Sequence, residues 1–152
     1  MKNTTLIILI LFLYSCGYSS IYKNQTSQNF KINIIEKKGN SEMNNLIKNE
    51  IKLYSVKNTT NIYNLKIDTD YKKKILTKDS AGIITDYKLS VTSIFRVDLK
   101  GVTKVIELKE TINIKNQSDS FEQNTYEKNI KRSFASSIRE KLISEIFSIN
   151  DN

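Results

Sequence analysis

The chain has 152 residues, a single cysteine, no histidine, no proline and a formal net charge of +8 at neutral pH. A single cysteine cannot form an intramolecular disulfide, and the lack of histidine removes the commonest general base and the commonest metal ligand. Cysteine–histidine zinc sites and serine–histidine nucleophile pairs are therefore excluded. A lone Ser or Thr would need a Lys base, the carboxylates are scattered, and the isolated glycines form no phosphate-binding loop. The composition predicts a protein that is not an enzyme and that holds no metal or cofactor.

The N-terminus has the pattern of a bacterial lipoprotein signal. Lys2 provides a positive charge, residues 6–13 form an unbroken apolar run, and the small Ser15 precedes Cys16. The run is shorter than the roughly 20 residues that a membrane-spanning helix needs. We therefore expect a signal peptide over residues 1–15 and acylation of Cys16. The alternative is a membrane-anchor stub with an incidental cysteine.

The residues after the signal indicate where the protein is held. The polar segment 16–29 reads as a lipidated N-terminus and tether, and two acyl chains are enough for stable membrane attachment. Bacterial lipoproteins retained in the inner membrane often carry Asp after the cysteine, so Gly17 favours the outer membrane. We expect an outer-membrane lipoprotein, anchored by palmitate-type chains on the periplasmic side. Nucleic acid is then not a partner, and the available anions are lipid head groups and lipopolysaccharide.

The first half of the mature chain predicts two strands and one helix. Alternating apolar residues indicate a short strand at 30–34, and a helix follows from Ser41, as N-cap, to about Ser55. A second strand is expected at 63–69. The polar stretch 70–82 reads as a loop that ends in a turn.

The second half carries the clearest periodicity. Residues 87–99 and 102–114 alternate in polarity around a tight Lys100-Gly101 turn and predict a long hairpin. Apolar residues then repeat every four positions, which predicts a terminal helix over roughly 121–149. The order is β-α-β-β-β-α. Because a one-faced sheet must bury that face, we expect an α+β two-layer sandwich, with a four-stranded mixed sheet and two helices packed on one face.

Several of these features together resemble the LPS-assembly lipoprotein family LptE, in its alphaproteobacterial branch. The run Cys-Gly-Tyr-Ser-Ser-Ile-Tyr at residues 16–22 is similar to that branch's lipidated start, although Ser20 stands where many members carry Pro. The alternating strand at 87–91 is similar too. So are three residues of the terminal helix: Ala135, Arg139 and Leu142.

The resemblance implies a non-enzymatic assembly factor with a single LptE-like domain over residues 30–149. Proteins of this family sit as a plug inside the outer-membrane β-barrel LptD, support its folding and take part in lipopolysaccharide delivery. Two helices on a four-stranded sheet are the fold that the family implies. The alternative is an unrelated periplasm-facing lipoprotein that binds protein or peptidoglycan and has no barrel partner.

Basic residues suggest where lipopolysaccharide phosphates would bind. A β-α-β crossover makes the first two strands parallel, so the end of the first strand, the loop ending at Gly82 and the loop 116–120 should share one end of the sheet. Seven lysines belong to these segments: Lys37, Lys38, Lys72, Lys73, Lys74, Lys78 and Lys115. The alternative is a solvated lysine rim in a lysine-rich chain, diluted by Asp68, Asp70 and Asp79.

Overall fold

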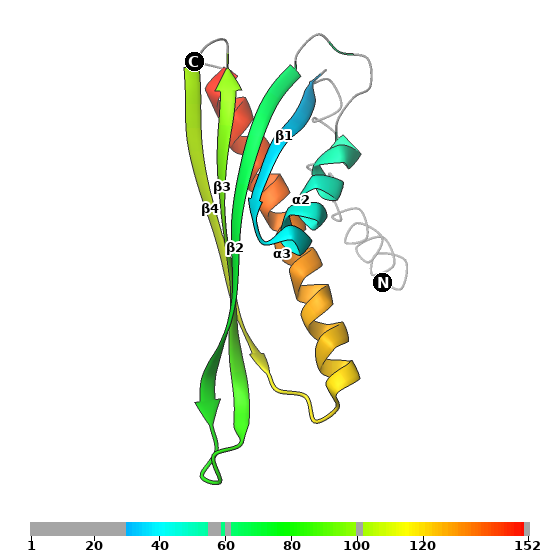
Figure 1. The fold of residues 1–152 in the computed structure, drawn as a ribbon, viewed down its shortest axis with the longest axis vertical. Helices are drawn as coiled ribbons and strands as arrows, with labels where there is room; N and C mark the ends of the chain where they lie inside the picture. Colours follow the sequence, from blue (N-terminus) through cyan, green and yellow to red (C-terminus); the bar gives the residue numbers. More distant parts are fainter. Residues whose placement is uncertain (1–29, 55–58, 60–61, 100–101, 151–152) are drawn as a thin grey trace, which may run out of the picture.

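The structure is a computed structural model that describes residues 30–54, 59, 62–99 and 102–150. Six elements follow one another in these residues: β1 (Lys31–Gly39), α2 (Ser41–Tyr54), β2 (Ile62–Lys78), β3 (Ile84–Leu99), β4 (Val102–Lys115) and α3 (Ser120–Asn150) (Figure 1). The predicted order β-α-β-β-β-α is confirmed. Within these residues, no helix combines the length and the apolar character needed to span a bilayer.

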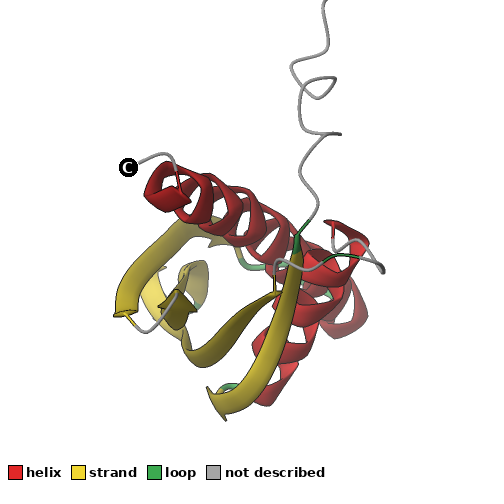
Figure 2. Cartoon of the chain, turned by 90° about the horizontal axis from the view of Figure 1, so that it is seen from above, coloured by secondary structure: helices red, strands yellow, loops and turns green. Residues whose placement is uncertain are grey.

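The four strands form one mixed sheet in the order β1-β2-β3-β4. β1 pairs parallel with β2, as the crossover through α2 requires, and the other two pairs are antiparallel. Both helices lie to one side of the sheet (Figure 2). The predicted α+β two-layer architecture is confirmed. None of the described helices and strands covers the face of the sheet turned away from the helices, which we call the open face.

The core lies between the sheet and the helices. Side chains alternate along a strand, so odd-numbered positions of β2 and β3 face the helices, and Leu65, Val91 and Phe95 are fully buried there. Ile47 of α2 and Ile138 of α3 meet them from the helical layer and are also fully buried. Burying one such side chain contributes about 1.5–3 kcal/mol. Packing of this apolar face therefore holds the two layers together.

Two strands are longer than their apolar pattern indicates, so the predicted boundaries at 30–34 and 63–69 are wrong. β1 continues to Gly39, and β2 continues through most of the expected 70–82 loop to Lys78. The second half of β2 is largely exposed, so its sequence lacks the alternation of apolar and polar residues that marks a half-buried strand. It is held instead by backbone pairing with β3, and the β2–β3 hairpin projects beyond the first turn of α3 (Figure 1).

The connection from β1 to α2 depends on a close backbone approach. Gly39 has a φ of 76°, and a Cβ at this position would lie 2.1 Å from the carbonyl oxygen of Thr69. Asn40 follows, and its Oδ1 accepts a hydrogen bond of 2.9 Å from the backbone N–H of Met43. Asn40 is therefore the N-cap of α2, and the expectation that Ser41 has this role is wrong.

Candidate functional site

The proposed lipidation residue, Cys16, lies outside the described residues, so the site is built from the lysines. Lys37 and Lys38 of β1 lie opposite Ile67 and Asp68 of β2. Lys78 is ten residues beyond Asp68 on the same strand, which corresponds to about 33 Å at ~3.3 Å per residue.

The seven lysines therefore do not gather at one end of the sheet. β1 has 9 residues and β2 has 17, so two parallel strands that run in the same direction end far apart. Lys115 lies opposite Asp86, whose other neighbour is Thr77 of β2, and so it belongs to the far half of the sheet together with Lys78. The loop cluster expected from topology is therefore spread along the sheet and does not form one site.

Lys73 is directed to the helical side of the sheet. Its Nζ lies 2.8 Å from Oε2 of Glu127 in α3, and the hydroxyl of Tyr71 donates a hydrogen bond of 2.8 Å to Oε1 of the same carboxylate. The Lys73 ammonium also lies 4.3 Å from the ring centroid of Tyr87. Lys73 thus stabilises the packing of α3 on β2, and this role separates it from its two lysine neighbours.

Lys131 completes the same group of charges, and we call Glu42, Tyr71, Lys73, Glu127 and Lys131 the Glu127 cluster. The Lys131 ammonium lies 2.8 Å from Glu42 in α2 and 3.6 Å from Glu127. Burial by itself raises the pKa of the Glu127 carboxyl, but hydrogen bonds from Lys73 and Tyr71 and the charges of both lysines lower that pKa below its ordinary value. Burial, and then the hydrogen bond to Glu127, raise the pKa of Tyr71. The cluster connects β2, α2 and α3.

The open face of the sheet carries a different set of charges. Even-numbered residues of β2 and β3 point to this face, where they meet odd-numbered residues of β4. Eight of them line a pocket of about 340 Å³, which we call the lysine pocket: Asp70, Lys72, Lys74, Lys88, Ser90, Thr92, Lys109 and Thr111. Lys72 and Lys74 were predicted as site residues, whereas Lys88 and Lys109 were not.

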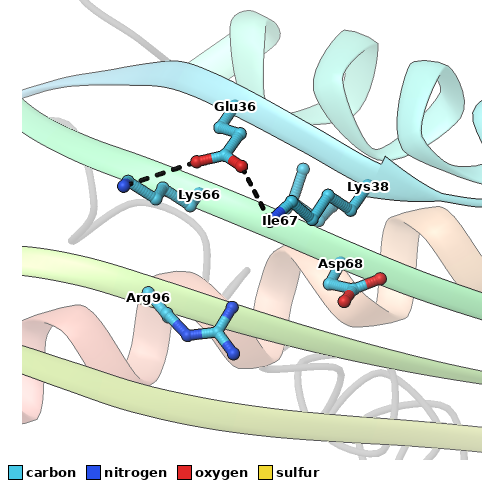
Figure 3. A pocket seen from close by; sticks show the side chains of 6 residues that line it. All are labelled: Glu36, Lys38, Lys66, Ile67, Asp68 and Arg96. Atoms are coloured by element: carbon cyan, nitrogen blue, oxygen red, sulfur yellow. Dashed lines mark ion pairs between the residues drawn. The ribbon is translucent and has the colours of Figure 1, made fainter.

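A second pocket of about 250 Å³ lies on the open face closer to β1 (Figure 3). Glu36 pairs with Lys38 at 3.0 Å and with Lys66 at 3.4 Å, and Asp68 and Arg96 also line this pocket. Hydrogen bonds from the two lysines lower the pKa of the Glu36 carboxyl. Because acids and bases are nearly balanced here, this pocket has much less excess positive charge than the lysine pocket.

Sequence reasoning missed Lys88, Ser90, Thr92, Lys109 and Thr111. The available signal was their position at the polar sites of the predicted hairpin strands, which places them on the face opposite the apolar residues. Their assembly with Lys72 and Lys74 also depends on β2 continuing as a strand, and the sequence pattern did not indicate that. The pocket therefore emerges only from the pairing of three strands.

Comparison with known proteins gives a likeness of fold without a likeness of sequence. No protein-family model matches the chain, and no curated protein matches it. Rare lipoprotein B from Shewanella oneidensis is similar with a TM-score of 0.60 and 12% identity, over 79% of this chain and 98% of that chain. A minor lipoprotein from Acinetobacter baumannii is similar with a TM-score of 0.56 and 13% identity, over 81% of this chain and 94% of that chain.

Lipoprotein B from Nitrosomonas europaea is also similar, with a TM-score of 0.53 and 9% identity, over 80% of this chain and 85% of that chain. The matched region is nearly the whole of each neighbour, so the likeness concerns a complete fold and not a shared fragment. The chain therefore has the fold of a group of small bacterial lipoproteins that includes rare lipoprotein B.

Proposed function

We propose that this protein is a non-enzymatic outer-membrane lipoprotein that acts as plug and assembly partner of an LptD-like β-barrel in lipopolysaccharide transport and insertion. The observation that carries the proposal is the fold likeness to rare lipoprotein B over 98% of that chain, taken together with the resemblance of residues 16–22 to the LptE family. The signal pattern that ends at Cys16 supports it independently, because it is a feature of the sequence and not of the fold.

The β2–β3 hairpin offers a surface for such a partner. Ile75, Leu76 and Ile83 lie near its tip with 51%, 45% and 62% of their surfaces exposed. Exposed apolar side chains that cluster on a projecting element are typical of protein contact sites. Under this proposal the hairpin inserts among the side chains of the barrel lumen, while the acyl chains on Cys16 hold the domain at the membrane.

Co-purification tests the barrel partnership. Native protein extracted from outer membranes in neutral detergent should carry a large β-barrel in stoichiometric amount. Replacing Ile75, Leu76 and Ile83 by Ser should reduce the recovered barrel, whereas Ser at the three exposed residues Leu53, Ile62 and Val105 is a matched apolar control. If no barrel accompanies the wild-type protein, the partnership is refuted and the alternative of a protein- or peptidoglycan-binding module gains support.

The lipid anchor has its own test. In the Cys16→Ser variant the acceptor thiol is lost, so the signal-bearing precursor should accumulate without acyl chains. Among the described residues the core begins at Phe30, well after Cys16, so the domain should still fold. Palmitate labelling of this protein, isolated from the envelope fraction, measures the effect. Label that persists on the variant protein would contradict the assignment of Cys16.

We propose lipopolysaccharide as the ligand of the lysines that the sequence analysis selected. Two groups of these lysines, one on β1 and one near the tip of the β2–β3 hairpin, can be tested separately. Replacing Lys37 and Lys38 by Ser removes the group on β1, and replacing Lys78 and Lys115 removes the group near the hairpin tip. Binding of lipopolysaccharide to the purified protein, measured for each pair, would show which group contributes. Equal binding by both variants and the wild type would exclude all four residues.

A further inference from the structure

We propose that the lysine pocket on the open face of β2, β3 and β4 is a binding site for phosphate ester groups. The pocket goes beyond the barrel partnership, because it lies on the side of the sheet away from the helices and includes residues from β3 and β4 that the sequence-based site did not contain. Strand register, the like-charge pair Lys74–Lys88 and the chemistry of the lining side chains all favour an anionic ligand.

The register places a hydroxyl at the centre of the pocket and lysines around it. Ser90 on β3 lies opposite Lys72 of β2 on one side and Thr111 of β4 on the other. One step along the same face, Lys88 lies opposite Lys74. One step in the other direction, Thr92 of β3 lies opposite Lys109 of β4. Short hydroxyl side chains thus form the floor, and long ammonium side chains surround it.

The pair Lys74–Lys88 is unfavourable in the free protein. Directly opposite residues in an antiparallel pair have Cβ atoms about 4.5–5.5 Å apart, and like charges at this spacing are destabilising. The other like-charged pair on this face, Lys66 opposite Arg96, has the carboxylate of Glu36 beside it, 3.4 Å from Lys66. Lys74 and Lys88 share a pocket with one acid, Asp70.

Two acids that are close to this pair along β2 and β3 already have partners. Asp70 forms an ion pair with Lys72. Asp86, two residues before Lys88, accepts hydrogen bonds from the hydroxyls of Thr77 and Thr85. A local arrangement that costs stability without a compensating gain in the folded protein is typical of a functional site. A bound anion between Lys74 and Lys88 would supply the missing negative charge.

The lining selects the class of anion. Ammonium groups act as point charges and hydroxyl groups donate hydrogen bonds, and phosphate oxygens accept both. None of the eight lining residues has an apolar or aromatic side chain that would hold an acyl chain or a nucleobase. The volume of about 340 Å³ falls in the lower part of the range of about 300–1,000 Å³ found for small-molecule sites, which suits a phosphorylated head group better than a bare ion.

The neighbouring lysine shows that this arrangement is specific to one face. Within the run Lys72-Lys73-Lys74, alternation directs the middle residue to Glu127 and the outer two to the pocket. The ligand would therefore contact lysines from three strands, and not the Lys72-Lys73-Lys74 run as such. Phosphate esters reach the pocket either as lipid head groups or as soluble molecules, and the test separates the two sources.

The experiment uses the full acylated chain in neutral detergent. Equilibrium dialysis with radiolabelled glycerol 3-phosphate represents the soluble source. The shift in thermal unfolding midpoint in micelles containing phosphatidic acid, relative to phosphatidylcholine, represents the head-group source, because a ligand that binds only the folded state raises the midpoint. Binding in either arm supports the site and identifies its source. Wild-type protein that binds in neither arm overturns the proposal.

The site variant is Lys74→Gln with Lys88→Gln, and the control is Lys104→Gln with Lys128→Gln, which removes the same charge from exposed positions outside the pocket. We expect at least tenfold weaker binding for the site variant, unchanged or higher resistance to urea because repulsion is relieved, and near wild-type binding for the control. An equal loss in both variants would show that net charge alone attracts the anion and would overturn the site. The site variant should still co-purify with the barrel, so loss of a barrel from wild-type protein refutes only the proposed function.

Discussion

Neutralising Glu127 should weaken the attachment of α3 to β2. The Glu127→Gln variant keeps the shape of the side chain but removes the charge that Lys73 and Tyr71 contact at 2.8 Å each. Only 14% of the Glu127 side chain is exposed, so water replaces little of what is lost. Hydrogen bonds to charged groups contribute about 1.5–3 kcal/mol each, and a neutral acceptor retains roughly half of this. We expect the free energy of unfolding to fall by about 2 kcal/mol at neutral pH.

The pH dependence distinguishes this effect from a simple packing defect. Because the pKa of Glu127 is lower in the folded protein than its ordinary 4.5, its stabilisation is present above that value and is lost as the pH falls through the folded pKa. The difference between wild type and variant should therefore narrow as the pH falls below about 4.5.

Urea unfolding followed by circular dichroism at several pH values measures both effects. Glu122→Gln is the matched control, because Glu122 is exposed in the first turn of the same helix. Its effect should stay within about 0.5 kcal/mol. The reasoning is refuted if the two variants lose the same stability at neutral pH, or if the loss at Glu127 stays constant down to the lowest pH.

Three further substitutions test the fold. Tyr71→Phe removes a hydrogen bond to the charged Glu127 and should cost about 1.5–3 kcal/mol at neutral pH. Since the Tyr71 pKa is raised above its ordinary 10.0, this difference should narrow above that pH in alkaline urea titrations. Gly39→Ala should lower the thermal unfolding midpoint more than Gly82→Ala, because both glycines have positive φ but only at Gly39 would a Cβ collide with a backbone carbonyl. A similar midpoint for the two would contradict the close approach. Phe95→Ala removes a fully buried ring and should lower the free energy of unfolding in urea by about 3–5 kcal/mol. A loss no larger than that of an exposed substitution would contradict the position of Phe95 in the core.

Local periodicity carried much of the fold. The spacing of apolar residues is a property of neighbouring positions, so the helices at Ser41–Tyr54 and Ser120–Asn150 and the strands at Ile84–Leu99 and Val102–Lys115 were each predicted within a few residues. The layer architecture then followed, because one-faced elements have few ways to bury their apolar sides. The signal at Cys16 is also local, and it stays a prediction since it lies outside the described residues.

The candidate site was less accessible to sequence reasoning. The segment after Asp70 was interpreted as a loop because its residues are polar on both sides, and a strand that leaves the shelter of the helices has no apolar face to reveal it. If the strand ends at residue 69, as its apolar pattern predicts, Lys72, Lys73 and Lys74 form a single run of charge in a loop. The structure separates them between two faces of the sheet.

What the sequence determined by itself was the kind and order of the elements and the side of each that is buried, because those follow from side-chain spacing along a single segment. The tertiary structure decided how far β2 extends, that Lys73 meets Glu127, and that Lys74 faces Lys88 beside Ser90. These contacts depend on which residues of distant strands stand opposite one another. Register depends on the hydrophobic patterns of both strands and on the turn between them, so a polar segment such as the second half of β2 does not reveal its partner residues by itself.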